Sequence, residues 1–220
     1  MQRDVAELIL PKPDGGYTLA GRVDDLIFTN QDYYMASYLI DIDSAGNVEN
    51  EWVSNTSGLR GPALDLLPAP NGHFFVSSSH PVAIPIAGGE MLMYQNAVYE
   101  LDENRNIVWD YFLDHKLDAE FLQSQLFYNA DTSSLIIAGT VYDSLPNTTQ
   151  YRRRAWLQAF DLTTKEVLWR RYIEAPVVDY GAGTQIYDIE QLPDGGYLLC
   201  GDARDNDPNE VPQQLSLIHI

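Results

Sequence analysis

The sequence predicts an all-β fold, specifically a β-propeller built from four-stranded antiparallel blades. Three observations support this: a unit recurs along the chain, each unit contains two kinds of turn, and helix signals are almost absent. The aspartates at 43, 102 and 161 are spaced 59 residues apart, and each opens a turn before an apolar segment. Four short strands in a unit of about this length are typical of propeller blades.

The first kind of turn joins the first two strands of each unit. It reads Pro13-Asp-Gly-Gly-Tyr17, Pro70-Asn-Gly-His-Phe74 and Pro193-Asp-Gly-Gly-Tyr197, with a weaker form around Thr132. Asp-Gly and Asn-Gly between apolar runs predict hairpins of type I′, in which both central residues take positive φ. The sequence therefore predicts first strands at 64–67 and 186–189, and second strands at 74–76 and 197–200.

The second kind of turn begins at Asp43, Asp102 and Asp161 and joins the third and fourth strands. We expect third strands at 37–42, 97–101 and 155–160, and fourth strands at 48–53, 107–112 and 167–172. A helical stripe can be drawn over 118–126. However, 121–127 falls where the repeat requires the first strand of the third unit, so we interpret it as a strand.

These units place blades at about residues 5–55, 62–114, 120–174 and 185–214, all within a partial propeller of residues 1–214. About three and a half blades are expected, and a propeller ring takes about four to eight. We therefore expect an incomplete ring and a chain that is a fragment. Residues 215–220 resemble the in-frame translation of a transposon-end adapter, and we interpret them as a non-native tail.

Charge and composition exclude several classes of partner. The net charge is −19, and six of the 13 basic residues fall between Arg152 and Arg171. Such an acidic chain repels phosphate backbones, so nucleic acid is not an expected partner. No apolar run approaches the length of about 18 residues that spans a membrane, so membrane insertion is not expected. The single cysteine excludes an internal disulfide framework.

The repeating unit resembles the Asp-Gly-Gly-Tyr repeats of bacterial secreted and cell-surface propeller proteins, and the match spans nearly the whole chain. The segment Ala159-Phe-Asp-Leu-Thr-Thr-Lys-Glu-Val-Leu-Trp169 also resembles the tryptophan-docking motif of quinoprotein (PQQ)-like propellers, with Lys165 in place of the usual glycine. Trp52 and Trp109 lie near the equivalent position, although Trp52 is offset by two residues. The resemblance implies a propeller fold and an extracellular, cell-surface or periplasmic location.

A ligand site is expected on the rim opposite the short turns. There the segments 22–36, 79–96 and 140–154 are long and dissimilar, and long loops often carry function. The alternative is that their tyrosines cover blade edges and their charges solvate loops. The candidate ligand-binding residues are Tyr33, Tyr34, His80, Glu90, Tyr142, Asp143, Tyr151, Arg152, Arg153 and Arg154.

Asp65 and Asp188 are candidate metal ligands, because each lies five residues before the proline of its turn on an innermost strand. Paired carboxylates suit Ca²⁺, but a full site needs about six to eight oxygens, and the other blades offer Leu8 and Leu126. A water-filled acidic channel or hydrogen bonding to the backbone explains the pair as well.

The sequence contains no recognisable catalytic set, and its three central histidines are scattered. We therefore expect a non-catalytic binding or interaction scaffold, with no resident cofactor, whose ligand is a protein, a glycan or a small molecule. The alternatives are a quinoprotein-like oxidoreductase holding a quinone and Ca²⁺, suggested by the segment 159–169, and a carbohydrate-binding module, suggested by the tyrosine-rich segments.

Overall fold

The structure is a computed structural model that describes residues 4–25, 34–54, 61–86, 89–113, 124–144, 151–173, 183–204 and 214–219. These residues form strands joined by turns, and no α-helix occurs among them. The chain divides into two compact units, Met1–Phe121 and Leu122–Ile220. The prediction of an all-β fold is confirmed.

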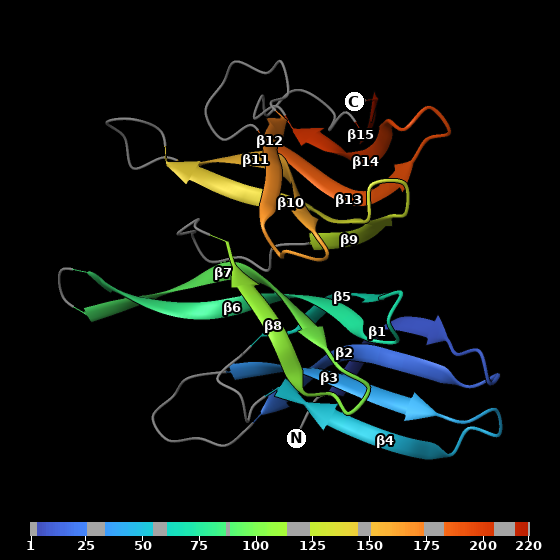
Figure 1. The fold of residues 1–220 in the computed structure, drawn as a ribbon. Helices are drawn as coiled ribbons and strands as arrows, with labels where there is room; N and C mark the ends of the chain where they lie inside the picture. The colour runs from blue at the N-terminus through green and yellow to red at the C-terminus, as the bar shows by residue number, and fades with distance from the viewer. Residues whose placement is uncertain are drawn as a thin grey trace. The chain divides into compact units, whose positions relative to one another are not determined.

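The first unit contains two four-stranded sheets, and all strand pairs in them are antiparallel (Figure 1). The first sheet has the order β1 (Asp4–Pro11), β2 (Tyr17–Asp25), β3 (Tyr34–Ile42), β4 (Val48–Val53). The second has the order β5 (Ala63–Pro68), β6 (Phe74–Ile86), β7 (Gly89–Leu101), β8 (Ile107–Phe112). Each sheet is therefore a simple up-and-down meander.

The second unit repeats this meander and adds further strands. Its complete sheet consists of β9 (Ser124–Asn129), β10 (Ser134–Ser144), β11 (Tyr151–Asp161) and β12 (Val167–Ile173). A fourth sheet consists of β13 (Gly183–Gln191), β14 (Tyr197–Arg204) and β15 (Gln214–His219). One parallel pairing, Arg153 with Gly183, links β11 to β13. The predicted four-stranded antiparallel sheets are thus present in each repeat that the structure describes in full.

The expected long loops of the rim are largely strands. In each of the first three sheets the second and third strands stay paired beyond the outer strands. The last pairs are Asp25 with Tyr34 in β2–β3, Ile86 with Gly89 in β6–β7 and Ser144 with Tyr151 in β10–β11. The prediction of loops is therefore wrong for most of 79–96 and 140–154, and for the ends of 22–36, whose residues 26–33 lie outside the described part of the chain. Pairing the backbone groups of both strands satisfies donors and acceptors that a loop would leave to solvent.

The short turns occur where predicted, but their type differs. In the Pro13 turn, the Lys12 nitrogen donates to the Gly16 oxygen and the Gly15 nitrogen donates to the Lys12 oxygen. Only Gly15 has positive φ, at 88°, which identifies a type I turn followed by a left-handed residue. Proline explains the difference, because its φ is fixed near about −65° and cannot take the positive value that type I′ requires.

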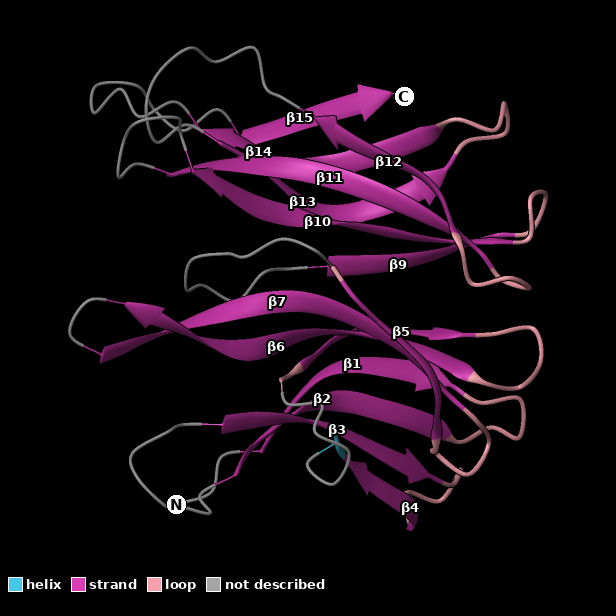
Figure 2. Ribbon diagram, turned by 60° about the vertical axis from the view of Figure 1, so that its left-hand side comes forward, coloured by secondary structure: helices cyan, strands magenta, loops and turns pink. Residues whose placement is uncertain are grey.

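The turns at Asp43, Asp102 and Asp161 have the same design. Gly46, Arg105 and Lys165 occupy the left-handed position, with φ of 86°, 63° and 62°. The last turn is one residue longer, as the sequence indicated, and its backbone bond runs from the Lys165 nitrogen to the Asp161 oxygen. The described turns gather at one end within each unit (Figure 2).

The fourth sheet differs from the sequence prediction. It was expected to contain only two strands, with 215–220 outside the fold. Instead β15 pairs antiparallel with β14, with Leu199 opposite Ile218 and Gly201 opposite Ser216. Without β15, that edge of β14 would lack a paired strand among the described residues. A β-prone segment readily pairs with such an edge.

Two apolar clusters form the cores, one in each unit. In the first unit, Ala20 and Leu39 of the first sheet pack with Leu66, Val76 and Tyr99 of the second. In the second unit, a cluster joins the third sheet to the fourth; it contains Ile136, Ala138, Leu157, Ile186 and Leu199. Each pair of neighbouring sheets within a unit therefore shares one core, as repeat architectures require.

The tryptophans of the three fourth strands, Trp52, Trp109 and Trp169, have related positions. Trp52 packs against the first core with its ring 6.1 Å from that of Tyr99, and Trp169 packs against the second core. Trp169 lies opposite Ala159 and Trp109 opposite Glu100, whereas Trp52 lies opposite Leu39, two residues further from its turn. The predicted offset of Trp52 is confirmed. It leaves the ring on the same face of its sheet, because strand side chains alternate with a period of two.

Candidate functional site

The extended middle hairpins β2–β3, β6–β7 and β10–β11 hold most of the candidate ligand-binding residues. Tyr34 ends the β2–β3 hairpin opposite Asp25, and Glu90 lies opposite Pro85 near the end of β6–β7. His80, on β6, has its ring 5.2 Å from that of Phe112 on β8. Tyr33 lies outside the described residues. These residues come from separate hairpins, so no compact site made from all of them is described.

The third hairpin does bring its candidates together. Tyr151 pairs with Ser144, and the backbone register sets Asp143 opposite Arg152 and Tyr142 opposite Arg153. Arg154 follows, opposite Val141. Six candidates thus occupy one two-stranded ribbon, on which three arginines accompany one aspartate.

The two candidate metal ligands occupy equivalent positions, as predicted. A register irregularity falls immediately before Asp65 in β5 and before Asp188 in β13. The Leu66 nitrogen donates to Asp65 Oδ1 at 2.8 Å, and the Ile189 nitrogen donates to Asp188 Oδ1 at 2.9 Å. Each carboxylate therefore caps its own irregular backbone, which is the backbone bonding that the sequence left as an alternative.

Metal ligation by these carboxylates stays a prediction. Among the described residues, no group of three or more His, Cys, Asp or Glu side chains is placed to hold an ion.

The repeated turn aspartates are structural. Asp102 Oδ1 accepts hydrogen bonds from the backbone nitrogens of Asn104 and Asn106 at 2.8 and 2.7 Å. Asp43 Oδ1 accepts the equivalent bonds from Ala45 and Asn47. Hydrogen bonds from the following asparagine side chain and backbone lower the pKa of both carboxyls. Backbone bonds from Thr164 and Thr163 likewise lower the pKa of Asp161. These bonds stabilise the ionised form, so the turn is held best when the aspartate is charged.

A buried polar network joins the first two sheets near these turns. Arg105 Nη2 contacts Asp41 Oδ1 and Oδ2 at 2.7 and 2.5 Å, and Thr18 Oγ1 donates to Asp41 Oδ1 at 2.6 Å. The Arg105 guanidinium also lies 4.2 Å from the centre of the Phe74 ring. Both partners of the ion pair are at least 90% buried. The network fills the space between the sheets at the turn end.

No equivalent of this ion pair joins the third and fourth sheets among the described residues, because Ala159 takes the place of Asp41. Ala159 precedes the turn aspartate Asp161 by two residues, as Asp41 precedes Asp43. Ala159 pairs with Ile136 on the neighbouring strand, whereas Asp41 pairs with Thr18. A pocket of about 420 Å³ opens on the turn side of this sheet pair, between β12 and the two turns that precede β10 and β14. Its position is opposite to the rim where the sequence reasoning placed any site.

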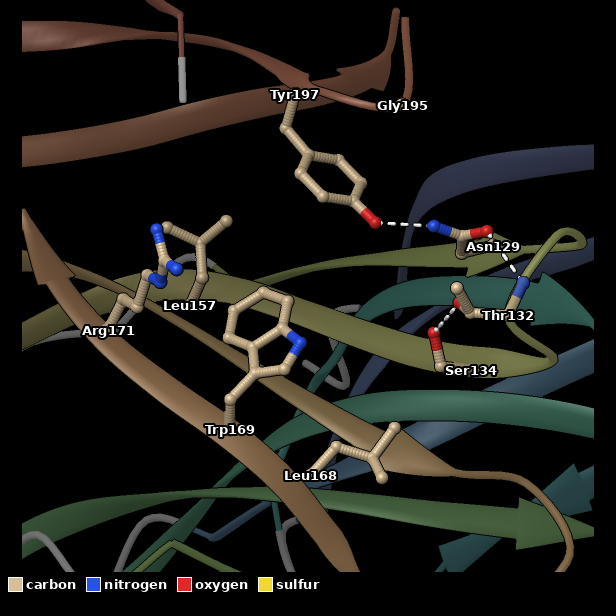
Figure 3. A pocket seen from close by; sticks show the side chains of 9 residues that line it. All are labelled: Asn129, Thr132, Ser134, Leu157, Leu168, Trp169, Arg171, Gly195 and Tyr197. Atoms are coloured by element: carbon tan, nitrogen blue, oxygen red, sulfur yellow. Dashed lines mark hydrogen bonds between the residues drawn. The ribbon is translucent and has the colours of Figure 1, made fainter.

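Trp169, Leu157 and Tyr197 form the apolar and aromatic walls of the pocket (Figure 3). Arg171 lies two residues after Trp169 on β12, and its guanidinium is 5.9 Å from the centre of the Trp169 ring. Tyr197 extends from the start of β14, and its ring packs edge-on against Phe127 at 6.0 Å. The walls therefore come from three strands, β11, β12 and β14.

The Tyr197 hydroxyl has a fixed orientation. Asn129 Oδ1 accepts hydrogen bonds from the backbone nitrogens of Asp131 and Thr132 at 3.1 and 3.2 Å, which sets the orientation of the side-chain amide. Its Nδ2 then donates to the Tyr197 oxygen at 2.5 Å (Figure 3). Because the phenol oxygen is the acceptor in this bond, its own proton remains available as a donor.

Sequence reasoning missed this pocket. Trp169 and Tyr197 belong to repeated motifs and Arg171 ends the basic segment, but no sequence pattern places these residues in one site with Asn129. Two signals were present: Trp169 and Arg171 are two apart on a strand and share a face, and the turn after Asn129 lacks the proline and glycines of the other first turns. The irregular turn supplies the amide that orients Tyr197.

The chain matches no model of a known protein family, and no curated protein matches its sequence. Among the described residues, no helix has the length and apolar character needed to cross a membrane.

Proposed function

We propose that this chain forms blades of a β-propeller that acts as a non-catalytic binding scaffold of a secreted or surface-exposed protein. The extended middle hairpin of each of the three complete sheets, β2–β3, β6–β7 or β10–β11, is the binding element. Three meander sheets, a repeated turn between the third and fourth strands of each, and a shared core in each sheet pair support the propeller arrangement.

One observation carries the choice of surface: the middle hairpins extend past the outer strands. In the second sheet, β5 pairs with β6 only as far as Ser78, and β8 pairs with β7 only from Ala97. Between them, 79–86 and 89–96 form a ribbon to which no third strand is paired among the described residues. Such a ribbon presents backbone edges and both faces to a partner, whereas the opposite end consists of short repeated turns.

The third hairpin indicates the chemistry of the partner. It concentrates Arg152, Arg153 and Arg154 in a chain of net charge −19. A cluster of arginines attracts acidic groups within about one Debye length, about 8 Å at physiological salt, where more distant acidic residues of the chain are screened. We therefore propose an acidic polymer as the ligand, with a sulfated polysaccharide as the probe.

The test is retention of the whole chain on immobilised heparin in low salt. The variant R152Q/R153Q/R154Q should lose retention, whereas K12Q/R22Q/K165Q, which removes the same charge elsewhere, should keep it. Equal loss in both variants, or no retention of the unaltered chain, would contradict the proposed surface.

A second candidate function is a quinoprotein-like oxidoreductase, and the segment Ala159–Trp169 favours it. Trp169 packs against the core that joins two neighbouring sheets, as a docking tryptophan does. Adding pyrroloquinoline quinone and Ca²⁺ and measuring dye reduction and melting temperature tests it. Absence of both turnover and a thermal shift would eliminate this candidate.

A further inference from the structure

The pocket beside Trp169 and Tyr197 is separate from the β10–β11 hairpin end, and its lining carries positive charge but no carboxylate. Arg171 is the only ionisable lining residue apart from Tyr197, and no aspartate or glutamate lines the pocket among the described residues. In a chain with 32 acidic residues, a pocket without a carboxylate is favourable for an anion. The Arg171 fork can hold a carboxylate in a bidentate pair.

The walls favour a flat ring. Trp169 is half-buried, and Leu157, opposite Arg171 in the strand register, is 1% exposed. An indole face beside an apolar side chain stacks against the face of a planar or pyranose ring. A volume of about 420 Å³ lies at the small end of the range for ligand pockets, which suits one ring or two.

Polar groups at the opposite wall supply a second point of recognition. The Tyr197 proton is available because Asn129 donates to its oxygen. Thr132 and Ser134 place two further hydroxyls at the same wall, bonded to each other at 2.7 Å. A ring oxygen or hydroxyl can therefore bind on the side away from Arg171.

We propose that this pocket binds a small ring-bearing carboxylate: the ring stacks on Trp169, the carboxylate pairs with Arg171 and Tyr197 donates to a ring substituent. Two sources share this chemistry, a uronic acid sugar and an aromatic acid. The site requires nothing from the proposed binding hairpins, so either can exist without the other.

The test is isothermal titration of the whole chain with galacturonate, its neutral counterpart galactose, and benzoate. Binding of galacturonate or benzoate, with galactose at least tenfold weaker, is expected, and the acid that binds more tightly identifies the source. R171Q should weaken the bound acid by about tenfold, because it removes a charge-assisted hydrogen bond.

R170Q is the matched control, since Arg170 is the neighbouring residue on the same strand and its Nε contacts Gln158, a residue outside the pocket lining. It should leave acid binding unchanged. Y197F tests the donor without changing volume and should weaken the acid with a ring hydroxyl more than benzoate. Melting temperatures establish that each variant is folded. Absence of binding by both acids, equal binding of galactose, or equal weakening by R171Q and R170Q would overturn the proposal.

Discussion

The buried pair Asp41–Arg105 gives the sharpest test of how the first two sheets are held together. Arg105 reaches from the second sheet to both carboxylate oxygens of Asp41 in the first, at 2.7 and 2.5 Å. Removing one partner of a buried pair leaves the other charge without compensation, which typically costs about 3–5 kcal/mol. R105A also loses the contact with Phe74, worth about 1 kcal/mol. A single substitution should therefore remove a large part of the stability of a domain, which is about 5–15 kcal/mol.

Urea unfolding of D41A, R105A and D41A/R105A measures this contribution. We expect the double variant to be little less stable than either single variant, which gives a coupling energy of about 3 kcal/mol. The coupling should change little with salt, because a buried pair is poorly screened. Additive effects of the two substitutions would contradict this prediction, since they would mean that the two side chains do not interact in solution.

Three further predictions concern the turns and the core. G46A should lower the free energy of unfolding by about 1 kcal/mol, measured by urea unfolding, because Gly46 has a left-handed φ of 86°. The space around its Cβ position is open, so the loss reports backbone strain and no steric clash. A45G, at the preceding residue, is its control; an equal loss there would contradict a left-handed origin. D102N should flatten the acid side of the stability curve: the folded pKa of Asp102 is depressed, so its contribution is present above the unfolded value of about 3.9 and is lost as pH falls through the folded pKa. Unchanged acid unfolding of D102N would count against this. Y99F should cost about 1–2 kcal/mol, because Tyr99 is fully buried and donates to Ser37 Oγ at 2.5 Å, and a neutral thermal melt would be inconsistent with that bond.

The strand pattern could be predicted because the repeat is regular. The fourth strands Val48–Val53 and Ile107–Phe112 have the bounds that the sequence gives, since turn residues flank them on the side where the chain reverses. The turn type could also have been derived. Pro13 excludes positive φ at the first central position, and that constraint is visible in the sequence.

The hairpin extensions could not be predicted from the repeat. Segments 79–86 and 89–96 share no pattern with the other units, and proline at 81 and 85 argues against a strand. Their pairing follows from the partner strand, which is a tertiary property. Only the short segment from Ile86 to Gly89 had the glycine content of a turn.

The pocket was hidden for a related reason. Its lining combines residues far apart in sequence, and only the pairing of neighbouring sheets brings Asn129 to Tyr197. The sequence shows that Ala159 stands where the first sheet has Asp41. Whether that difference leaves a pocket depends on the side chains that the next sheet places opposite. Departures from the repeat indicated where to look, but not which groups would meet.

The most direct test of the proposed scaffold is the heparin affinity of the whole chain, compared with the two charge-matched variants over a range of salt. We expect the logarithm of the association constant for heparin to fall linearly with the logarithm of the salt concentration, with a shallower slope for R152Q/R153Q/R154Q only. The same slope and affinity in all three proteins would contradict the claim that the third hairpin is the binding surface.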